Sequence, residues 1–193
     1  MTSQTQYWNR LIQPGIVALV GAGGKTTVLS KLVEYGRLQG RPIVVTTTTQ
    51  LYESQVAQYE PIYTKDINEV DEYCTKRIQQ GYCGAWFSGI TRTKVDSVDC
   101  ESIDNLSTLH PNWQIVVEAD GAKEKWLKAP KHTEPVIPSQ TKTTIGVVNL
   151  QMLGASLDED HVHNLELVQS IVNREEGAIV TPSMLAQIVL HKQ

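Results

Sequence analysis

Short apolar runs alternate along the chain with segments whose apolar positions recur every three or four residues. Residues 15–20 form an apolar run that ends in glycines, which is typical of a buried β-strand. Residues 26–39 place their apolar side chains on helical spacing, and Gly40 and Pro42 follow them, which predicts an amphipathic helix. The β-branched residues 43–49 come next. The sequence therefore predicts a βαβ unit with parallel strands.

The same two patterns continue through the rest of the chain. Further strands are predicted at residues 84–89, 115–117, 144–150 and 178–180, and further helices at 66–80, 160–172 and 183–190. Thr181 and Pro182 suit the N-cap and the first position of the last helix. Alternating strands and helices predict an α/β sandwich with a mainly parallel central sheet and helices on both faces. The length predicts a single domain over residues 1–193.

Composition narrows the classes of partner. The net charge of −4 offers no basic face for a nucleic-acid backbone, and no apolar run approaches the length of a membrane span. The first 13 residues lack the layout of a signal peptide. Cys74, Cys83 and Cys100 have no Cys-x-x-Cys spacing, which is typical of reduced thiols. We therefore expect a cytoplasmic protein that binds neither nucleic acid nor membrane.

A glycine-rich motif separates the first strand from the first helix. Its sequence is Gly21-Ala22-Gly23-Gly24-Lys25-Thr26-Thr27. Glycines let backbone N–H groups converge on an anion, and the start of a helix adds further donors and positive partial charge. Lys25 can reach the outer phosphates of ATP or GTP, and the Thr26 hydroxyl can join the coordination shell of Mg²⁺. We predict that these seven residues bind a nucleotide in a P-loop-type sandwich.

The spacing of the glycines leaves other interpretations to weigh. The common G-x-x-x-x-G-K-[ST] pattern would place its first glycine at Leu19, inside the strand. The shorter G-x-x-G-K-T pattern, which begins at Gly21, resembles the loop of Mur-type ligases. A dinucleotide fingerprint would need glycine at position 26, which is Thr26, and an acidic end to the second strand. A plain strand-to-helix turn is the remaining alternative, and the strand–loop–helix context favours nucleotide binding.

Two carboxylates follow the apolar strand at residues 115–117. Glu118 and Asp120 lie two positions apart, so on a strand they share a face and can approach one cation. Mg²⁺ takes few protein carboxylates and keeps waters and phosphate oxygens. We predict that one of the pair, with Glu118 as the assigned ligand, binds Mg²⁺ and that the other orients a nucleophile. Lys25, Glu118 and Asp120 are the predicted catalytic residues; a solvated strand end is the alternative.

A run of threonines and two histidines are weaker candidates for contacts to a metal ion or a phosphate. Residues 46–49 are all threonines at the end of the second strand, where Thr47 and Thr48 are predicted to contact Mg²⁺ or a phosphate. Threonine also simply suits strands. On the predicted helix His161 and His163 lie about 200° apart and cannot share a metal ion. We interpret both as surface histidines.

Prolines interrupt the segment between Glu118 and Pro138, so we expect an ordered loop over the sheet edge. Its polar residues Lys123, Lys128, His132 and Glu134 form the predicted substrate loop. This loop could close over bound phosphates or hold a second substrate. A rigid surface crossover is the alternative.

Several motifs together resemble one protein family. They are, in order, residues 20–27, the threonines 46–49, Val-Glu-Ala-Asp-Gly-Ala-Lys at 117–123, Leu-Lys-Ala-Pro at 127–130 and Glu-Pro-Val-Ile-Pro at 134–138. Over residues 15–190 the chain resembles the YqeC family, described as accessory proteins of selenium-dependent hydroxylases. The resemblance implies that nucleotide binding or hydrolysis drives a cofactor-handling step. Its implied partners are a molybdenum hydroxylase or the proteins that mature its cofactor.

The chain departs from this family at two places. Asn164 stands where members carry arginine, so an anion contact by that arginine is missing. The printed sequence ends at Gln193, before a further strand and an Asn-x-x-Asp-like segment of the family, and we expect base recognition to depend on that segment.

Three functions are consistent with the sequence. The first is a Mg²⁺-dependent NTPase, because phosphoryl transfer mainly needs positioning and charge stabilisation. The second is a nucleotide-gated module that delivers a cofactor or docks on a client enzyme without significant turnover. The third, based on the loop alone, is a Mur-like ligase that activates an acid.

Overall fold

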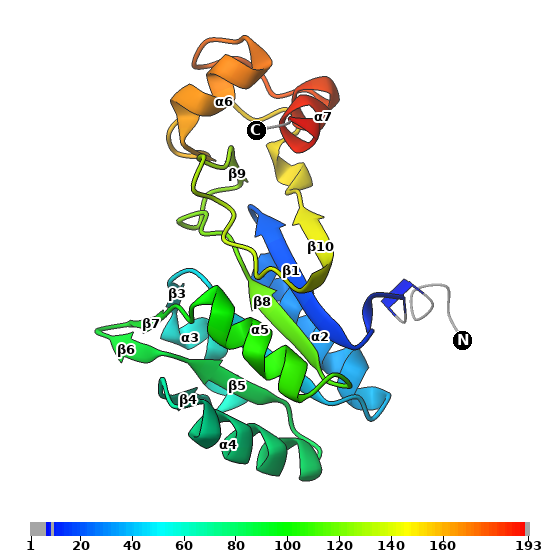
Figure 1. Cartoon of the computed structure of the whole chain (residues 1–193). Coiled ribbons are helices and arrows are strands. Elements are labelled where there is room, and N and C mark those ends of the chain that lie inside the picture. The colour runs from blue at the N-terminus through cyan, green and yellow to red at the C-terminus, as the bar shows by residue number, and fades with distance from the viewer. Residues whose placement is uncertain (1–6, 9, 192–193) are drawn as a thin grey trace.

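A parallel β-sheet forms the centre of the molecule. The computed structural model describes residues 7–8 and 10–191. Its sheet has six strands in the order β10-β1-β8-β2-β5-β4, and every neighbouring pair is parallel (Figure 1). The strands are β1 (Gly15–Gly21), β2 (Ile43–Thr47), β4 (Ile62–Tyr63), β5 (Gly84–Phe87), β8 (Gln114–Glu118) and β10 (Thr141–Val147). The predicted α/β fold with a parallel sheet is confirmed.

Helices cover both faces of this sheet. They are α2 (Lys25–Leu38) on one face, and α4 (Ile67–Gln79) and α5 (Cys100–Leu109) on the other. Successive strand residues point to opposite faces, and β1 shows the consequence. Leu19 packs in the cluster that contains Leu29 of α2, whereas Ala18 packs in the cluster that contains Ile103 of α5. The strands are therefore apolar on both sides, as a covered parallel sheet requires.

The sequence pattern missed the break after β5. The predicted strand at 84–89 is two strands, because β5 ends at Phe87 and β6 (Gly89–Thr91) leaves the main sheet. β6 joins an antiparallel sheet with β7 (Lys94–Asp96) and β3 (Leu51–Tyr52). The short helices α3 (Glu53–Val56) and η1 (Ala57–Tyr59) follow β3. Helix α5 was also absent from the predicted elements.

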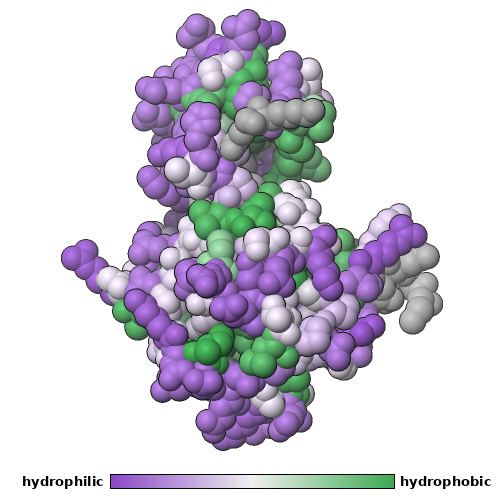
Figure 2. Space-filling model, viewed as in Figure 1, coloured by the Kyte–Doolittle hydropathy of each residue, from purple (hydrophilic) through white to green (hydrophobic). Residues whose placement is uncertain are grey.

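The residues after β10, together with a short strand that precedes β10, form a second unit above the carboxyl edge of the sheet (Figure 1). We call it the C-terminal lobe; it consists of β9 (Leu127–Lys128), η2 (Leu150–Met152), β11 (Val162–His163), α6 (Leu165–Val172) and α7 (Pro182–Leu190). Its buried side chains, among them Leu127, Met152 and Val168, form a hydrophobic cluster of their own. Hydrophobic side chains also gather on the outside of the lobe near α7 (Figure 2). The single domain over residues 1–193 stays a prediction.

Two predictions in the lobe are wrong and one is confirmed. The helix predicted at 160–172 begins only at Leu165, because Asp158 binds the backbone and ring of His161 in a turn and Asn164 adopts φ 60°. The strand predicted at 178–180 is a single bridge between Ile179 and Ser156. The last helix starts as predicted, with Thr181 accepting a hydrogen bond from the Met184 N–H at 3.4 Å.

Two further sequence expectations concern thiols and membranes. Cys74, Cys83 and Cys100 are free, as expected. Burial raises the pKa of the Cys74 thiol to about 12, so this thiol stays protonated at neutral pH. Of the helices in the described part of the chain, none combines the length and apolar character needed to cross a membrane.

Candidate functional site

The loop between β1 and α2 depends on its glycines. We call Gly21–Gly24 the glycine loop. Gly21, Gly23 and Gly24 have φ of 97°, 67° and 132°, which favour glycine. A Cβ on Gly21 would lie 2.3 Å from the Val147 carbonyl oxygen, and one on Gly23 would lie 2.5 Å from the Asn149 Cβ. The loop is thus packed tightly against β10 and the residues after it, and its other side faces a pocket.

Replacing Gly21 with alanine tests this packing, and Gly40 provides a matched control. Gly40 also has a positive φ of 65°, but nothing lies within 4 Å of an added Cβ. We expect Gly40→Ala to cost about 1–2 kcal/mol of unfolding free energy from backbone strain alone. Gly21→Ala should cost a further ~1–3 kcal/mol because the Val147 carbonyl must move. Urea unfolding measures both values, and equal losses would contradict the tight packing.

The start of α2 is open to an anion. No side chain caps this end of the helix, and its first turn contains no acidic residue. The first N–H groups of a helix have no partner within it and carry positive partial charge. Such an end is suited to binding phosphate.

Lys25 and Glu118 form a buried pair beside the glycine loop. The Lys25 Nζ donates to the Gly21 carbonyl oxygen at 2.8 Å and lies 3.6 Å from the Glu118 Oε1. Their side chains are only 5% and 6% exposed. Burial lowers the pKa of Lys25 and raises that of Glu118, while the attraction between the two charges opposes both shifts.

One oxygen of Glu118 is unused. Its Oε2 is buried and has no hydrogen-bond partner among the described residues. Because a buried polar atom without a partner is costly, such atoms often belong to ligand sites. Thr26 lines the same pocket, and its side chain opposes the rise that burial causes in the pKa of Glu118. Glu118 and Thr26 can therefore offer oxygen atoms to a cation or water.

Both carboxylate oxygens of Asp120 have partners, unlike those of Glu118. Its Oδ2 accepts a hydrogen bond from the Gly21 N–H at 3.1 Å, and its Oδ1 is paired with the Lys128 Nζ. The same Nζ donates to the Gly121 carbonyl oxygen and to Glu134 Oε2, both at 2.8 Å. Lys128 belongs to β9, so this network joins the glycine loop to the C-terminal lobe.

A pocket of about 540 Å³ lies beside the glycine loop, over the carboxyl ends of the strands. Of the predicted site residues, those that line it are Gly23, Gly24, Lys25, Thr26, Glu118, Lys123 and Glu134. Its remaining walls come from residues 49–52, Gln55, Lys94, residues 121–122, 124–125 and His163. The volume is within the usual range for small-molecule sites.

Other predicted site residues lie outside this lining. They are Gly21, Ala22, Thr27, Thr47, Thr48, Asp120, Lys128 and His132. The Thr47 hydroxyl donates to the Glu118 carbonyl oxygen at 2.7 Å and joins the ends of β2 and β8, whereas the Thr48 hydroxyl donates to the Val136 carbonyl oxygen at 2.6 Å, in the segment before β10. His132 is exposed. The assignment of Thr47 and Thr48 to Mg²⁺ stays a prediction.

Tyr52, Lys94 and His163 are among the pocket-wall residues that sequence reasoning missed. Tyr52 lies three residues after the threonine run, and this closeness in sequence was the available indication. Lys94 reaches the pocket only because β7 pairs with β3. His163 was placed on a helix, whereas it lies on β11 and pairs in register with Lys128.

The fold and the site together define an α/β protein with a parallel sheet and a glycine loop beside a buried Lys–Glu pair. The chain belongs to the YqeC family, because the model of the family described as YqeC protein matches residues 17–166. It is 29% identical to the uncharacterized protein YqeC of Escherichia coli (strain K12) over 182 residues, which cover 94% of this chain and 70% of the relative. No solved structure matches the chain.

Proposed function

We propose that the chain binds ATP or GTP with its phosphates at the glycine loop, and that it hydrolyses the nucleotide. The observation that carries the proposal is the buried Lys25–Glu118 pair, which lies at the uncapped start of α2 and has one carboxylate oxygen without a partner. A buried ammonium at this place can neutralise phosphate charge in a low-dielectric setting. A purely structural turn would not need a buried charged pair with an unused oxygen.

The residues present fit a Mg²⁺ ion that is held jointly with the nucleotide. Among the described residues no three His, Cys, Asp or Glu side chains are grouped to hold a metal. Mg²⁺ typically binds through one or two protein oxygens plus phosphate oxygens and waters. Glu118 and the Thr26 hydroxyl are the proposed protein ligands. When bound, the ion would neutralise charge on the phosphates.

The chain's own residues would supply positioning and electrostatic stabilisation. Lys25 would stabilise negative charge on the outer phosphates, and the N–H groups at the start of α2 would orient them. Asp120, the predicted orienter of a nucleophile, accepts the hydrogen bond of the Gly21 N–H and is therefore better suited to fix the glycine loop. Glu118, with one carboxylate oxygen toward the ion, would use the other oxygen to position an attacking water.

A second candidate function is favoured by the Asp120–Lys128 contact. Because Gly21 is linked through Asp120 to Lys128 of β9, a nucleotide at the glycine loop can bias the position of the C-terminal lobe. This is the physical requirement for a nucleotide-gated module that delivers a cofactor or docks on a client without turnover.

Family membership supports a proposal about the biological role. We propose that the chain acts in the cytoplasm as an accessory protein in the maturation of a selenium-dependent molybdenum hydroxylase. The client enzyme or its cofactor-maturation proteins would be its partners. In this role the nucleotide would drive, or time, a cofactor-handling step.

Phosphate release distinguishes the two candidate functions. If the chain is an NTPase, Glu118→Gln should lower the rate of phosphate release from Mg·ATP or Mg·GTP about 100-fold or more, as expected for loss of a group that positions the nucleophile. Glu34→Gln is the matched control, because Glu34 forms an exposed pair with Lys31 on the same helix α2. Nucleotide binding without phosphate release, even with a client present, would favour the gated module.

A further inference from the structure

The pocket extends well beyond the glycine loop. The glycine loop follows β1, Glu118 ends β8 and residues 49–52 follow β2, and these three strands are adjacent in the sheet. Neighbouring strands lie about 4.8 Å apart, so the far end of the pocket is about 10 Å from the loop. On the opposite side, Val147 and Asn149 fill the space against the loop. The free volume therefore lies past Lys25 and Glu118, toward β3, β7 and the lobe.

The pocket lining carries several basic side chains besides Lys25. They are Lys94 from β7, Lys123 and Lys125 from the segment after β8, and His163 from β11, and we call these four residues the basic wall. Two acidic residues, Glu124 and Glu134, share the lining, and Glu134 is already paired with Lys128. Among the described residues none of the ion pairs involves Lys94, Lys123 or His163. A positive wall in a chain of net charge −4 indicates an anionic ligand.

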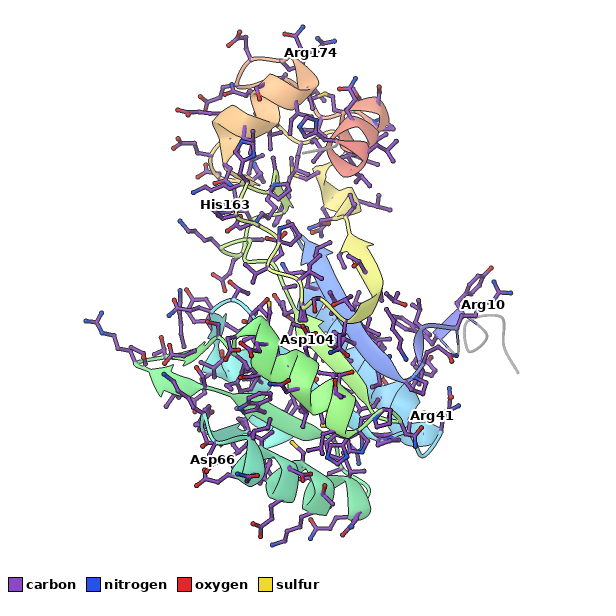
Figure 3. The ribbon with its side chains drawn as sticks, viewed as in Figure 1. Arg10, Arg41, Asp66, Asp104, His163 and Arg174 are labelled. Atoms are coloured by element: carbon purple, nitrogen blue, oxygen red, sulfur yellow. The ribbon has the colours of Figure 1, made fainter. Side chains whose placement is uncertain are left out.

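His163 is placed to contact such a ligand. It lies on the underside of the C-terminal lobe, below α6 and toward the sheet (Figure 3). Burial lowers the pKa of His163, and the nearby charges of Lys128 and Lys123 lower it further. The ring is thus neutral at pH 7 and offers one N–H donor.

The backbone of the same wall is strained. Lys123 and Glu124 have φ of 47° and 62°, which is unusual for two successive residues that are not glycine. Such strain costs free energy and persists where the surrounding structure fixes it, often at ligand sites. Lys123 lines the pocket together with His163, and the two lie near enough for the Lys123 charge to act on the His163 ring.

We propose that this basic wall binds a second small molecule that carries an oxyanion, alongside the nucleotide at the glycine loop. The inference rests on the proposed function, because the glycine loop is assigned to the nucleotide. Lys123 and His163 recognise the oxyanion from the lobe side. Lys94, whose Nζ lies 5.0 Å from the centre of the Tyr52 ring, completes the wall from the β7 side.

The test uses the full chain saturated with Mg²⁺ and a non-hydrolysable nucleoside triphosphate, so that the glycine loop is filled. Inorganic phosphate and malonate are then titrated in separate calorimetric experiments. The double variant Lys123→Ala/His163→Gln should lose about tenfold or more in affinity for the anion that binds, since two donors are removed. Its affinity for the nucleotide should fall by a much smaller factor. Lys94→Ala should weaken the anion in the same direction.

Lys131→Ala is the control, because Lys131 is exposed, adds to the local positive charge and does not line the pocket. It should leave anion affinity within about twofold of wild type, since Lys131 does not line the pocket and its charge acts on the site only through solvent. Binding of phosphate or of malonate supports the inference, and malonate would favour acid activation. If the nucleotide binds and neither anion does, or if the double variant loses both ligands in parallel, the inference is wrong. Failure of the nucleotide itself to bind would instead overturn the proposed function.

Discussion

Replacing Lys25 with alanine should lower the affinity for ATP or GTP about 100-fold while the protein stays folded. The Lys25 Nζ lies at the glycine loop, 2.8 Å from the Gly21 carbonyl oxygen, and its side chain is 5% exposed. A buried, charge-assisted contact to phosphate contributes about 2–4 kcal/mol, and each 1.4 kcal/mol is tenfold in affinity. Glu118 loses its partner in this variant, but its raised pKa allows it to take up a proton.

Dissociation constants from equilibrium dialysis of the variant and the wild type measure this effect. Lys31→Ala is the control, since Lys31 lies on the same helix in an exposed pair with Glu34 and should not change the affinity. A circular dichroism spectrum and a urea unfolding curve establish that Lys25→Ala is folded. Equal nucleotide affinity in Lys25→Ala and wild type would show that Lys25 does not contact the phosphates.

Replacing Lys128 with methionine should have the largest effect on stability, about 3–5 kcal/mol of unfolding free energy. The Lys128 side chain is 1% exposed and pairs with both Asp120 and Glu134. Removal of one partner from a buried pair leaves the other charge buried and uncompensated. Asp120 would then be free to move. The Gly21 N–H, which donates a hydrogen bond to Asp120, would lose its fixed position.

Urea unfolding followed by tryptophan fluorescence measures the loss in Lys128→Met. The double variant Asp120→Asn/Lys128→Met should recover part of it, because no unpaired charge stays buried. Lys31→Met, which removes an exposed pair, should cost less than about 1 kcal/mol. Equal losses for Lys128→Met and Lys31→Met would mean that the buried network does not stabilise the fold.

Acidification should weaken the same network. The ion pair with Lys128 holds the pKa of Glu134 below its usual value, although burial works in the opposite direction. The folded state therefore binds this proton less readily than the unfolded state does. The stabilisation is fully present above the unfolded pKa and is lost as the pH falls through the lowered value. Lys128→Met should show less of this acid loss than wild type.

The sheet was predictable because its strands are covered on both faces. Residues such as Ala18 and Leu19 are apolar whichever face they point to, so the strand pattern was continuous and clear. The lobe was harder to predict. Asn164 begins α6 with a left-handed backbone conformation, and the turn before it is set by the side chain of Asp158. Apolar spacing alone does not report such contacts.

The candidate site also contains residues that could be predicted from the sequence and residues that could not. The glycine loop, Lys25 and Glu118 were predictable because they follow directly on strands that are adjacent in the sheet. Lys94 and His163 were not, because β7 and β11 reach the pocket only through pairing with β3 and β9. The role of Asp120 also needed the structure, since its partner Lys128 is set in place by β9. Local motifs thus predicted the side of the pocket that is formed by the glycine loop, and tertiary contacts determine its other walls.

Calorimetric titration of the wild-type chain with ATP and with GTP, each with and without Mg²⁺, would show whether the chain binds a nucleotide at all. We expect one nucleotide to bind per chain with micromolar affinity, more strongly with Mg²⁺, and the corresponding nucleoside without phosphates not to bind. In the proposed complex the phosphates make the contacts to the glycine loop and Lys25, so their removal should abolish the heat of binding. If neither triphosphate binds to protein whose unfolding curve shows it to be folded, the chain is not a nucleotide-binding protein.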